Sequence, residues 1–272
     1  MTKIGKLLAL SVLLYPLLPG SCRAECPPAE EILEYLAGID LRLASRTTRF
    51  SIEPPKQLYA KAAARPGKAA TERHRLQAAG VMVAELPVET LWMAINDEDH
   101  HADGDYLPIR YSQVIGGTSR GQSRLLFQYF RQLGVGRWWV DQMDMDGELF
   151  KRSREKLWEL RWQDKMDSYD GTPPPEVSID PRVPPIRETR GAWLLVPITE
   201  SCTLIEYFIS SDPGGLLSKA QLLMARSVIR DTLEGMTQLA VEHIDPSHEL
   251  SEFVLPDGEP LASPALPKTA GD

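Results

Sequence analysis

The segment from Ser218 to Ile244 constrains the fold of this chain more than any other, because its pattern predicts one long amphipathic helix. At about 100° per residue, its apolar side chains gather on one broad arc and its charged side chains lie opposite. The apolar arc comprises Leu222, Ala225, Val228, Ile229, Leu233, Met236, Leu239 and Ala240. A helix of about 27 residues is about 40 Å long. We therefore expect a whole sheet to lie beneath this apolar face.

Six runs of aromatic and β-branched residues precede this helix and are typical of strands. The runs begin at Ile109, Gln122, Val135, Lys156, Gly191 and Cys202. Tight turn signals between consecutive runs favour antiparallel pairing. A further strand is predicted over 76–86 and a short helix after Pro87, whereas the proline-dense segment 172–185 is expected to be a surface excursion. The chain therefore fits the α+β class.

Alternation within the runs predicts which side chains share a face of the sheet. Trp158, Leu160 and Trp162 point one way, and the polar side chains between them point the other way. This pattern predicts a sheet with one covered side and one wetter side. Trp138 and Trp139 are expected on opposite faces, and the sequence leaves open which of them faces inward.

The first 24 residues have the pattern of an export signal. Lys3 and Lys6 precede an apolar run over 7–18, and small residues precede the predicted cleavage point after Ala24. About 12 apolar residues are fewer than the roughly 20 that a membrane-spanning helix needs. We therefore predict cleavage near Ala24 and a periplasmic or secreted protein, with lipidation at Cys22 as the alternative.

Two cysteines remain after such a cleavage, Cys26 and Cys202. They either pair in an oxidising compartment or stay as two free thiols, and the sequence leaves both interpretations open.

Length and composition fit one main domain with appendages. After the signal at 1–24, we expect an N-terminal helix and linker over 25–75, the main domain over 76–245 and a disordered, proline-rich tail over 246–272. The formal net charge of -8 makes nucleic acid an unfavourable partner.

An acidic cluster follows the short helix and raises the question of a metal site. It comprises Asp97, Glu98, Asp99, His100, His101, Asp103 and Asp105. Adjacent histidines point apart on regular backbone, and an EF-hand loop is excluded because Ala102 occupies its required glycine position. We therefore expect a solvated loop, with no metal and no cofactor. The run from Gln142 to Ser153 also imitates a calcium loop, but it is predicted to be a hairpin turn.

Four segments in the second half of the chain resemble START domains, the steroidogenic acute regulatory protein-related lipid-transfer modules. They are Gly191 to Pro197 (GAWLLVP), Cys202 to Tyr207 (CTLIEY), Ser211 to Gly215 (SDPGG) and Asp231 to Met236 (DTLEGM). The likeness spans about 76–243 and includes Arg137-Trp138-Trp139-Val140, where the family often has Arg-Asp-aromatic-Val. The chain departs from the family after Asp97, where Glu-Asp-His-His replaces the usual aromatic residue.

The resemblance implies a helix-grip fold of the SRPBCC superfamily, in an exported, bacterial-type member. Such proteins have a curved antiparallel sheet, here of six to seven strands, that grips the C-terminal helix around an apolar tunnel. The tunnel holds a lipid or another hydrophobic molecule. A twisted sheet curls and a straight helix does not, so the space between them holds either bulky side chains or a cavity. Gly235 lowers helix propensity by about 1 kcal/mol relative to Ala, so a cavity or close packing against a strand is expected to require it.

The ligand-binding residues expected from this comparison lie on the strands and on the inner face of the long helix. They are Trp92, Tyr111, Phe127, Arg137, Trp139, Trp193, Glu206, Met224, Val228, Thr232 and Met236. The loop 97–106 is the expected mouth, and the protein is expected to be a monomer that contacts membranes transiently.

Two other functions stay open. An enzyme of the cyclase or hydrolase type would use Arg137, Glu206 or Asp231 as acid or base, although the sequence has no Gly-x-Ser-x-Gly elbow and no recognisable catalytic triad, so no catalytic residue is assigned. A ligand-free interaction module would have its interior filled by side chains.

Overall fold

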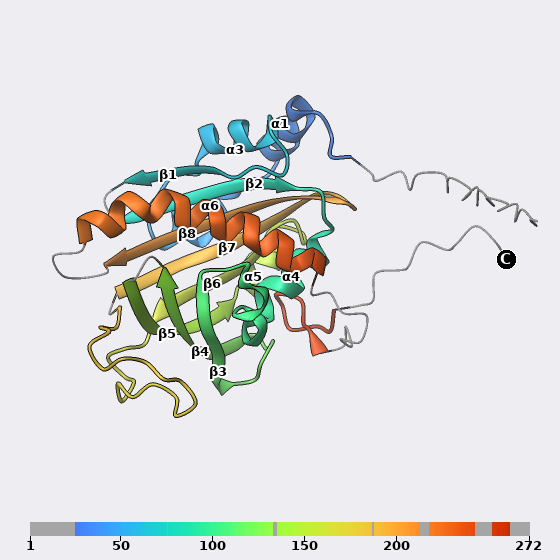
Figure 1. Ribbon diagram of the computed structural model, residues 1–272. Helices are drawn as coiled ribbons and strands as arrows, with labels where there is room; N and C mark the ends of the chain where they lie inside the picture. The colour runs from blue at the N-terminus through green and yellow to red at the C-terminus, as the bar shows by residue number, and fades with distance from the viewer. Residues whose placement is uncertain are drawn as a thin grey trace, which may run out of the picture.

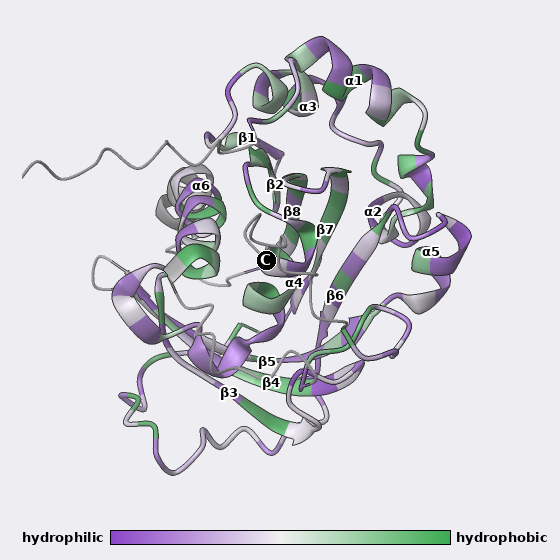
Figure 2. Cartoon of the chain, turned by 90° about the vertical axis from the view of Figure 1, so that its right-hand side faces the viewer, coloured by the Kyte–Doolittle hydropathy of each residue, from purple (hydrophilic) through white to green (hydrophobic). Residues whose placement is uncertain are grey.

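The computed structural model describes residues 25–261, apart from residues 75, 133–134, 187, 213–217 and 243–251. An antiparallel sheet of eight strands curves around a long C-terminal helix, as Figures 1 and 2 show. The strands are β1 (Ala70–His74), β2 (Gln77–Ala84), β3 (Ile109–Gly117), β4 (Ser123–Gln132), β5 (Val135–Met145), β6 (Trp158–Asp164), β7 (Glu188–Thr199) and β8 (Cys202–Asp212). The α-helices are α1 (Ala29–Ala37), α2 (Ser45–Thr48), α3 (Lys56–Ala63), α4 (Val88–Asn96), α5 (Gly147–Arg152) and α6 (Ser218–Glu242). This is the α+β, helix-grip arrangement that the sequence resemblance implied.

Three short 3-10 helices complete the described chain: η1 (Leu41–Leu43), η2 (Glu98–His100) and η3 (Asp103–Asp105). Among the described residues, none of the helices combines the length and the apolar character that crossing a membrane requires. The predicted export signal and the Asp-Pro-Gly-Gly element before α6 lie largely outside the described residues.

The sheet order is β1-β2-β8-β7-β6-β5-β4-β3, and every neighbouring pair is antiparallel. The seven strands predicted from the sequence are present. The eighth strand, β1, was not predicted from the sequence. Its sequence ATERH has no apolar alternation, because its side chains are exposed or only partly buried at the edge of the sheet. It pairs with β2, which is buried along almost its whole length.

α6 and α4 fill the concave side of the sheet (Figure 2). Ile229, Leu233 and Met236 of α6 belong to the main core, together with inward side chains from most strands. Gly80 of β2 lets the helix approach closely, because a Cβ at this position would overlap Ile229 and Leu233. α6 is therefore seated on the β1, β2 and β8 side of the sheet.

Most of the outer face of β2, β7 and β8 and the start of β6 are covered, which corrects the prediction of a wetter side, although Gln163 near the end of β6 is exposed. α1, α2 and α3 pack on this face in a second core (Figure 2). Glu159 is fully buried there, where the backbone N–H of Ser45 donates to its carboxylate over 2.8 Å. The N-terminal segment supplies the partner of Glu159, so the polarity of this side chain gave no indication that it is buried.

Cys26 and Cys202 form a disulfide bond, which decides between the two interpretations that the sequence left open. The bond ties the start of the described N-terminal segment to the first residue of β8, and Cys202 is fully buried.

The surface excursion 172–185 is confirmed, and it packs on the outer face of β4 and β5. Val177, Ile179 and Val183 contact a small core of Phe127, Trp138 and Val140. The indole N–H of Trp138 donates to the carbonyl of Val183 over 3.2 Å.

Two predictions about irregular segments were wrong. The predicted hairpin turn after Met145 is the helix α5, where the Asp146 side chain caps the helix by accepting from the backbone N–H of Leu149 over 3.0 Å. Within the predicted disordered tail, residues 252–261 are folded against the main core, with Val254 bridged to Pro260 and with Phe253 buried.

Candidate ligand-binding cavity

A cavity of about 260 Å³ lies between the sheet and α6. Its walls come from every strand of the sheet, from α4 and the loop after it, and from one face of α6. Most of the lining side chains are apolar or aromatic. They include Ala78, Ile95, Leu107, Ile109, Leu126, Phe130, Met143, Trp162 and Ile209.

The side chains of β5 show which face of the sheet lines the cavity. Arg137, Trp139, Asp141 and Met143 all line it, as the period of two requires. Trp138 lies on the opposite face in the outer core. The structure therefore selects Trp139 as the inward tryptophan of the pair.

Six of the predicted ligand-binding residues line the cavity. They are Arg137, Trp139, Trp193, Val228, Thr232 and Met236. The last three stand at i, i+4 and i+8 on α6, so one stripe of the helix forms the wall. Met224 continues this stripe by spacing, but its side chain lies outside the described part of the chain.

Four other predicted ligand-binding residues lie away from the cavity, and each has a structural partner instead. Phe127 and Tyr111 face outward and pack edge to face, with ring centroids 6.0 Å apart. Trp92 packs against Trp158 and donates its indole N–H to the carbonyl of Val254 over 2.8 Å. Glu206 is buried on the outer face.

Arg46 and the hydroxyl of Tyr59 hold Glu206 in this outward position, with the Tyr59 oxygen 2.6 Å from the carboxylate. Asp231, the third acid or base candidate, forms a partly exposed ion pair with Arg230 and is not part of the cavity lining.

Sequence reasoning missed several polar residues of the lining, of which Asp141 is the most unusual. It is 3% exposed, and its Oδ1 has no hydrogen-bond partner among the described residues. Burial raises the pKa of Asp141 well above its usual range, and the charge of Asp164 raises it further. The sequence could have indicated this position, because Asp141 is two residues after Trp139 on the same strand and therefore faces the same side of the sheet.

His101 and Tyr207 are further missed residues of the lining. Burial lowers the pKa of His101, and its Nε2 lies 3.0 Å from the carbonyl oxygen of Ala94. The imidazole is therefore neutral at ordinary pH. Burial also raises the pKa of Tyr207, and the charge of Asp141 adds to this effect.

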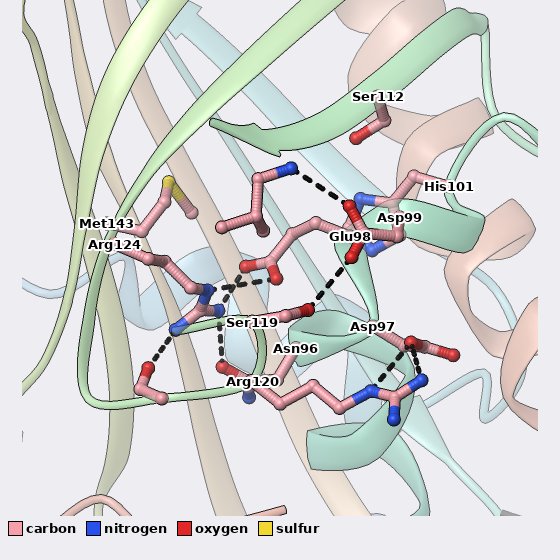
Figure 3. A network of polar contacts seen from close by, with 12 residues as sticks. Asn96, Asp97, Glu98, Asp99, His101, Ser112, Ser119, Arg120, Arg124 and Met143 are labelled. Atoms are coloured by element: carbon pink, nitrogen blue, oxygen red, sulfur yellow. Dashed lines mark hydrogen bonds and ion pairs between the residues drawn. The ribbon is translucent and has the colours of Figure 1, made fainter. Parts of the chain in front are cut away.

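The acidic loop after α4 is only partly the solvated loop expected from its composition: Asp99, Asp103 and Asp105 are exposed, but ion pairs and hydrogen bonds hold its first residues in place (Figure 3). Glu98 and Arg124 form a fully buried ion pair, and the Arg124 guanidinium also donates to Asn96 Oδ1 over 2.7 Å. Asp97 pairs with Arg120 at 2.8 Å.

Asp99 completes this network by accepting from the backbone N–H of Val114 over 2.9 Å and from the Ser119 hydroxyl over 2.8 Å. The two arginines come from the β3–β4 connection and the start of β4, so the sequence gave no local signal of the pairing. In the described part of the chain, no group of three or more His, Cys, Asp or Glu side chains is arranged to hold a metal ion.

The end of this loop rests directly on α6. A Cβ at Gly235 would overlap the carbonyl oxygen of Tyr106 and press on Leu107. The glycine is therefore required by close packing against a loop, and not against a strand. Glu98, His101, Leu107 and Pro108 bring the same loop into the cavity wall.

Comparisons with known proteins bear on the fold. No family model matches the sequence, and no curated protein matches it. The chain is similar in structure to the STAR-related lipid transfer protein from Xanthomonas axonopodis, with a TM-score of 0.47 and 13% identity over 61% of this chain and 86% of that one. It is also similar to human StAR-related lipid transfer protein 5, with a TM-score of 0.46 and 10% identity over 80% of this chain and 100% of that one.

A third similar structure is the Zhui aromatase/cyclase from Streptomyces sp. R1128, with a TM-score of 0.42 and 12% identity over 66% of this chain and 99% of that one. At these identities, none of the three indicates what this chain binds.

Proposed function

We propose that this protein binds a hydrophobic small molecule in the cavity between the sheet and α6, and that it carries or stores that molecule. The observation that carries the proposal is the cavity itself, about 260 Å³ of space with a mainly apolar lining. A concave, mainly apolar space of this kind is typical of sites for hydrophobic ligands. Moving apolar surface out of water stabilises the complex by about 25 cal/mol per Å².

The position of Arg137 supports a polar end to this site. Its side chain lines the cavity and is largely buried, and its Nε has no hydrogen-bond partner among the described residues. One guanidinium nitrogen donates to the carbonyl of Gly136 over 2.7 Å. The Nε–H group is available to donate to a ligand oxygen.

We propose that the protein acts outside the cytoplasm. The export-like pattern of residues 1–24 and the Cys26–Cys202 disulfide both support this location, because disulfides persist in oxidising compartments. A carrier would be useful there, since a hydrophobic molecule must cross water between membranes.

We also propose a monomer that contacts a membrane transiently. Leu76 is 42% exposed and lines the cavity beside the β1–β2 turn, so an apolar side chain stands where the cavity reaches the surface. Membrane contact at this point would shorten the path of a ligand through water.

Extraction tests the binding proposal. The protein is purified from its native host without detergent and extracted with organic solvent, and the extract is analysed by mass spectrometry. We expect a hydrophobic compound in a fixed ratio to protein. An extract with no compound above the level of an unrelated protein purified in the same way would contradict the proposal.

Catalysis on a hydrophobic substrate is the second candidate, and the buried carboxyl of Asp141 in the cavity favours it. A carboxyl with a raised pKa is suited to act as a general acid. Incubation of the protein with the extracted compound separates the two functions: a carrier returns the compound unchanged, and an enzyme converts it.

A further inference from the structure

Asp141 stands in the cavity wall without a charged partner. It faces the interior from the middle of β5, between Leu126 of β4 and Asp164 of β6 in the sheet register. No arginine, lysine or histidine among the described residues forms an ion pair with it. Arg137, on the same face of the strand, is four residues away, or about 13 Å along the backbone.

An ionised carboxylate at this place is strongly disfavoured. Transfer of an unpaired charge into apolar surroundings costs so much free energy that the group becomes neutral instead. Asp164 adds a second negative charge nearby and strengthens the effect. The neutral form of Asp141 carries an O–H donor, and a buried donor without an acceptor is itself unfavourable by about 1–3 kcal/mol. A ligand oxygen would supply the missing acceptor.

We propose that Asp141 is a ligand-binding residue that donates a hydrogen bond to an uncharged oxygen of the ligand. The cavity then favours compact apolar molecules that bear a carbonyl, ether or hydroxyl group over plain hydrocarbons and over anions. This inference rests on the proposed function and names the class of ligand for the same site. An anionic group is disfavoured beside Asp141 because Asp164 of the neighbouring strand carries a negative charge there, whereas the cation Arg137 stands four residues away along β5.

The size of the cavity also favours compact ligands. Pockets for small molecules usually have volumes of about 300–1,000 Å³. A cavity of about 260 Å³ lies just below this range. It suits one ring system or one short chain, and a lipid with two long acyl chains would need a larger space.

Fluorene and fluorenone test the inference, because they differ only in a methylene group that is replaced by a carbonyl. Dissociation constants for both are measured by equilibrium dialysis with the wild-type protein and with Asp141→Leu. The ratio of the two constants is compared between proteins, so the different water solubility of the two compounds cancels. We expect the preference for fluorenone to fall about three- to tenfold in Asp141→Leu, because one hydrogen bond is lost.

Two matched variants make the result specific. Asp141→Asn keeps a donor of similar shape, so it should retain most of the preference and also serves if Asp141→Leu does not fold. Asp144→Leu makes the same substitution on the same strand but outside the cavity lining, and it should leave the preference unchanged. Loss of the preference in Asp144→Leu but not in Asp141→Leu would overturn the assignment to Asp141.

A pH series separates a hydrogen-bond donor from a merely structural side chain. The preference for fluorenone should disappear as the pH rises through the pKa of Asp141, because the carboxylate cannot donate. Other titratable groups also line the cavity, namely Glu98, His101, Arg137 and Tyr207. Asp164 lies opposite Asp141 on the neighbouring strand β6. The part of the pH dependence that is absent from Asp141→Leu therefore belongs to Asp141.

The outcomes distinguish this inference from the proposed function. Equal ratios in wild type and Asp141→Leu, with tight binding of both compounds, would overturn the role of Asp141 and leave a general hydrophobic site. Failure of the wild type to bind either compound would overturn the proposed function, and the inference with it. Tighter binding of fluorenecarboxylate than of fluorenone would overturn the preference for uncharged ligands.

Discussion

Glu159 links folding to pH through a single side chain. It is fully buried on the outer face of β6, and burial raises its pKa to about 7, against hydrogen bonds from Ser45 that lower it. The folded state therefore favours the protonated form. The contribution of Glu159 to the free energy of unfolding is complete below its unfolded pKa of about 4.5 and is lost as the pH rises through about 7. The loss amounts to about 3 kcal/mol.

We expect Glu159→Gln to remove this pH dependence. Urea unfolding between about pH 5 and about pH 8 should show a smaller change in the free energy of unfolding for the variant than for wild type. Glu148→Gln, at an exposed position of α5, is the matched control and should behave like wild type. The same pH dependence in wild type and Glu159→Gln would show that Glu159 titrates normally.

At the scale of residues, the sequence predicted which side chains of a strand share a face of the sheet. It did not predict which of the two faces lines the cavity. Both faces of this sheet carry apolar clusters, so apolar residues occur at both parities. Phe127 and Trp139 looked equally suited to a tunnel, yet Phe127 faces the outer core and Trp139 the cavity. Glu206 was also wrongly predicted to line the cavity. Its partner Arg46 lies 160 residues away in the sequence, so no neighbouring residue indicated that Glu206 faces outward.

At the scale of elements, the contact between α6 and the loop before β3 depends on Gly235. Alanine is the better helix former by about 1 kcal/mol, but its Cβ would overlap the backbone of Tyr106. We expect Gly235→Ala to lower the free energy of unfolding by about 1–3 kcal/mol, because the loop must shift. Gln238→Ala, on the exposed face of the same helix, is the control. A more stable Gly235→Ala variant in urea unfolding would contradict the close approach.

The disulfide determines how firmly the N-terminal helices are held on the sheet. Cys26 and Cys202 are 176 residues apart, so their bond closes a long loop of the unfolded chain. We expect replacement of both cysteines by serine to lower the free energy of unfolding by about 2–5 kcal/mol. Limited proteolysis should then cut first within residues 26–69. Unchanged stability of the double variant, or of the wild type after reduction, would argue against a structural role for the bond.

Long and strongly periodic elements could be predicted from the sequence, whereas elements held only by distant partners could not. α6 and the central strands have clear apolar periods, and they appear where the sequence placed them. β1 has no such period and is defined by its pairing with β2. Residues 252–261 lack periodicity too, and their order comes from contacts such as Trp92 with Val254.

At the scale of the whole molecule, the cavity results from a mismatch between two shapes. The sheet curves around α6, and the helix is seated on one side of the sheet through Gly80 (Figure 2). The remaining space lies toward β4, β5 and β6, where Trp139 and Trp162 line it without filling it. The sequence predicted this space only as one of two alternatives, because the volume depends on how far the helix stands from each strand.

Binding of Nile red, a dye whose fluorescence rises in apolar surroundings, tests the central claim most directly. Thr232→Trp should place an indole inside the cavity, whereas Arg230→Trp adds the same side chain on the exposed face of α6. We predict that Thr232→Trp weakens Nile red binding about tenfold or more, and that Arg230→Trp binds the dye like wild type. Equal binding by all three proteins would mean that the dye binds elsewhere and would contradict the assignment of the cavity as the binding site.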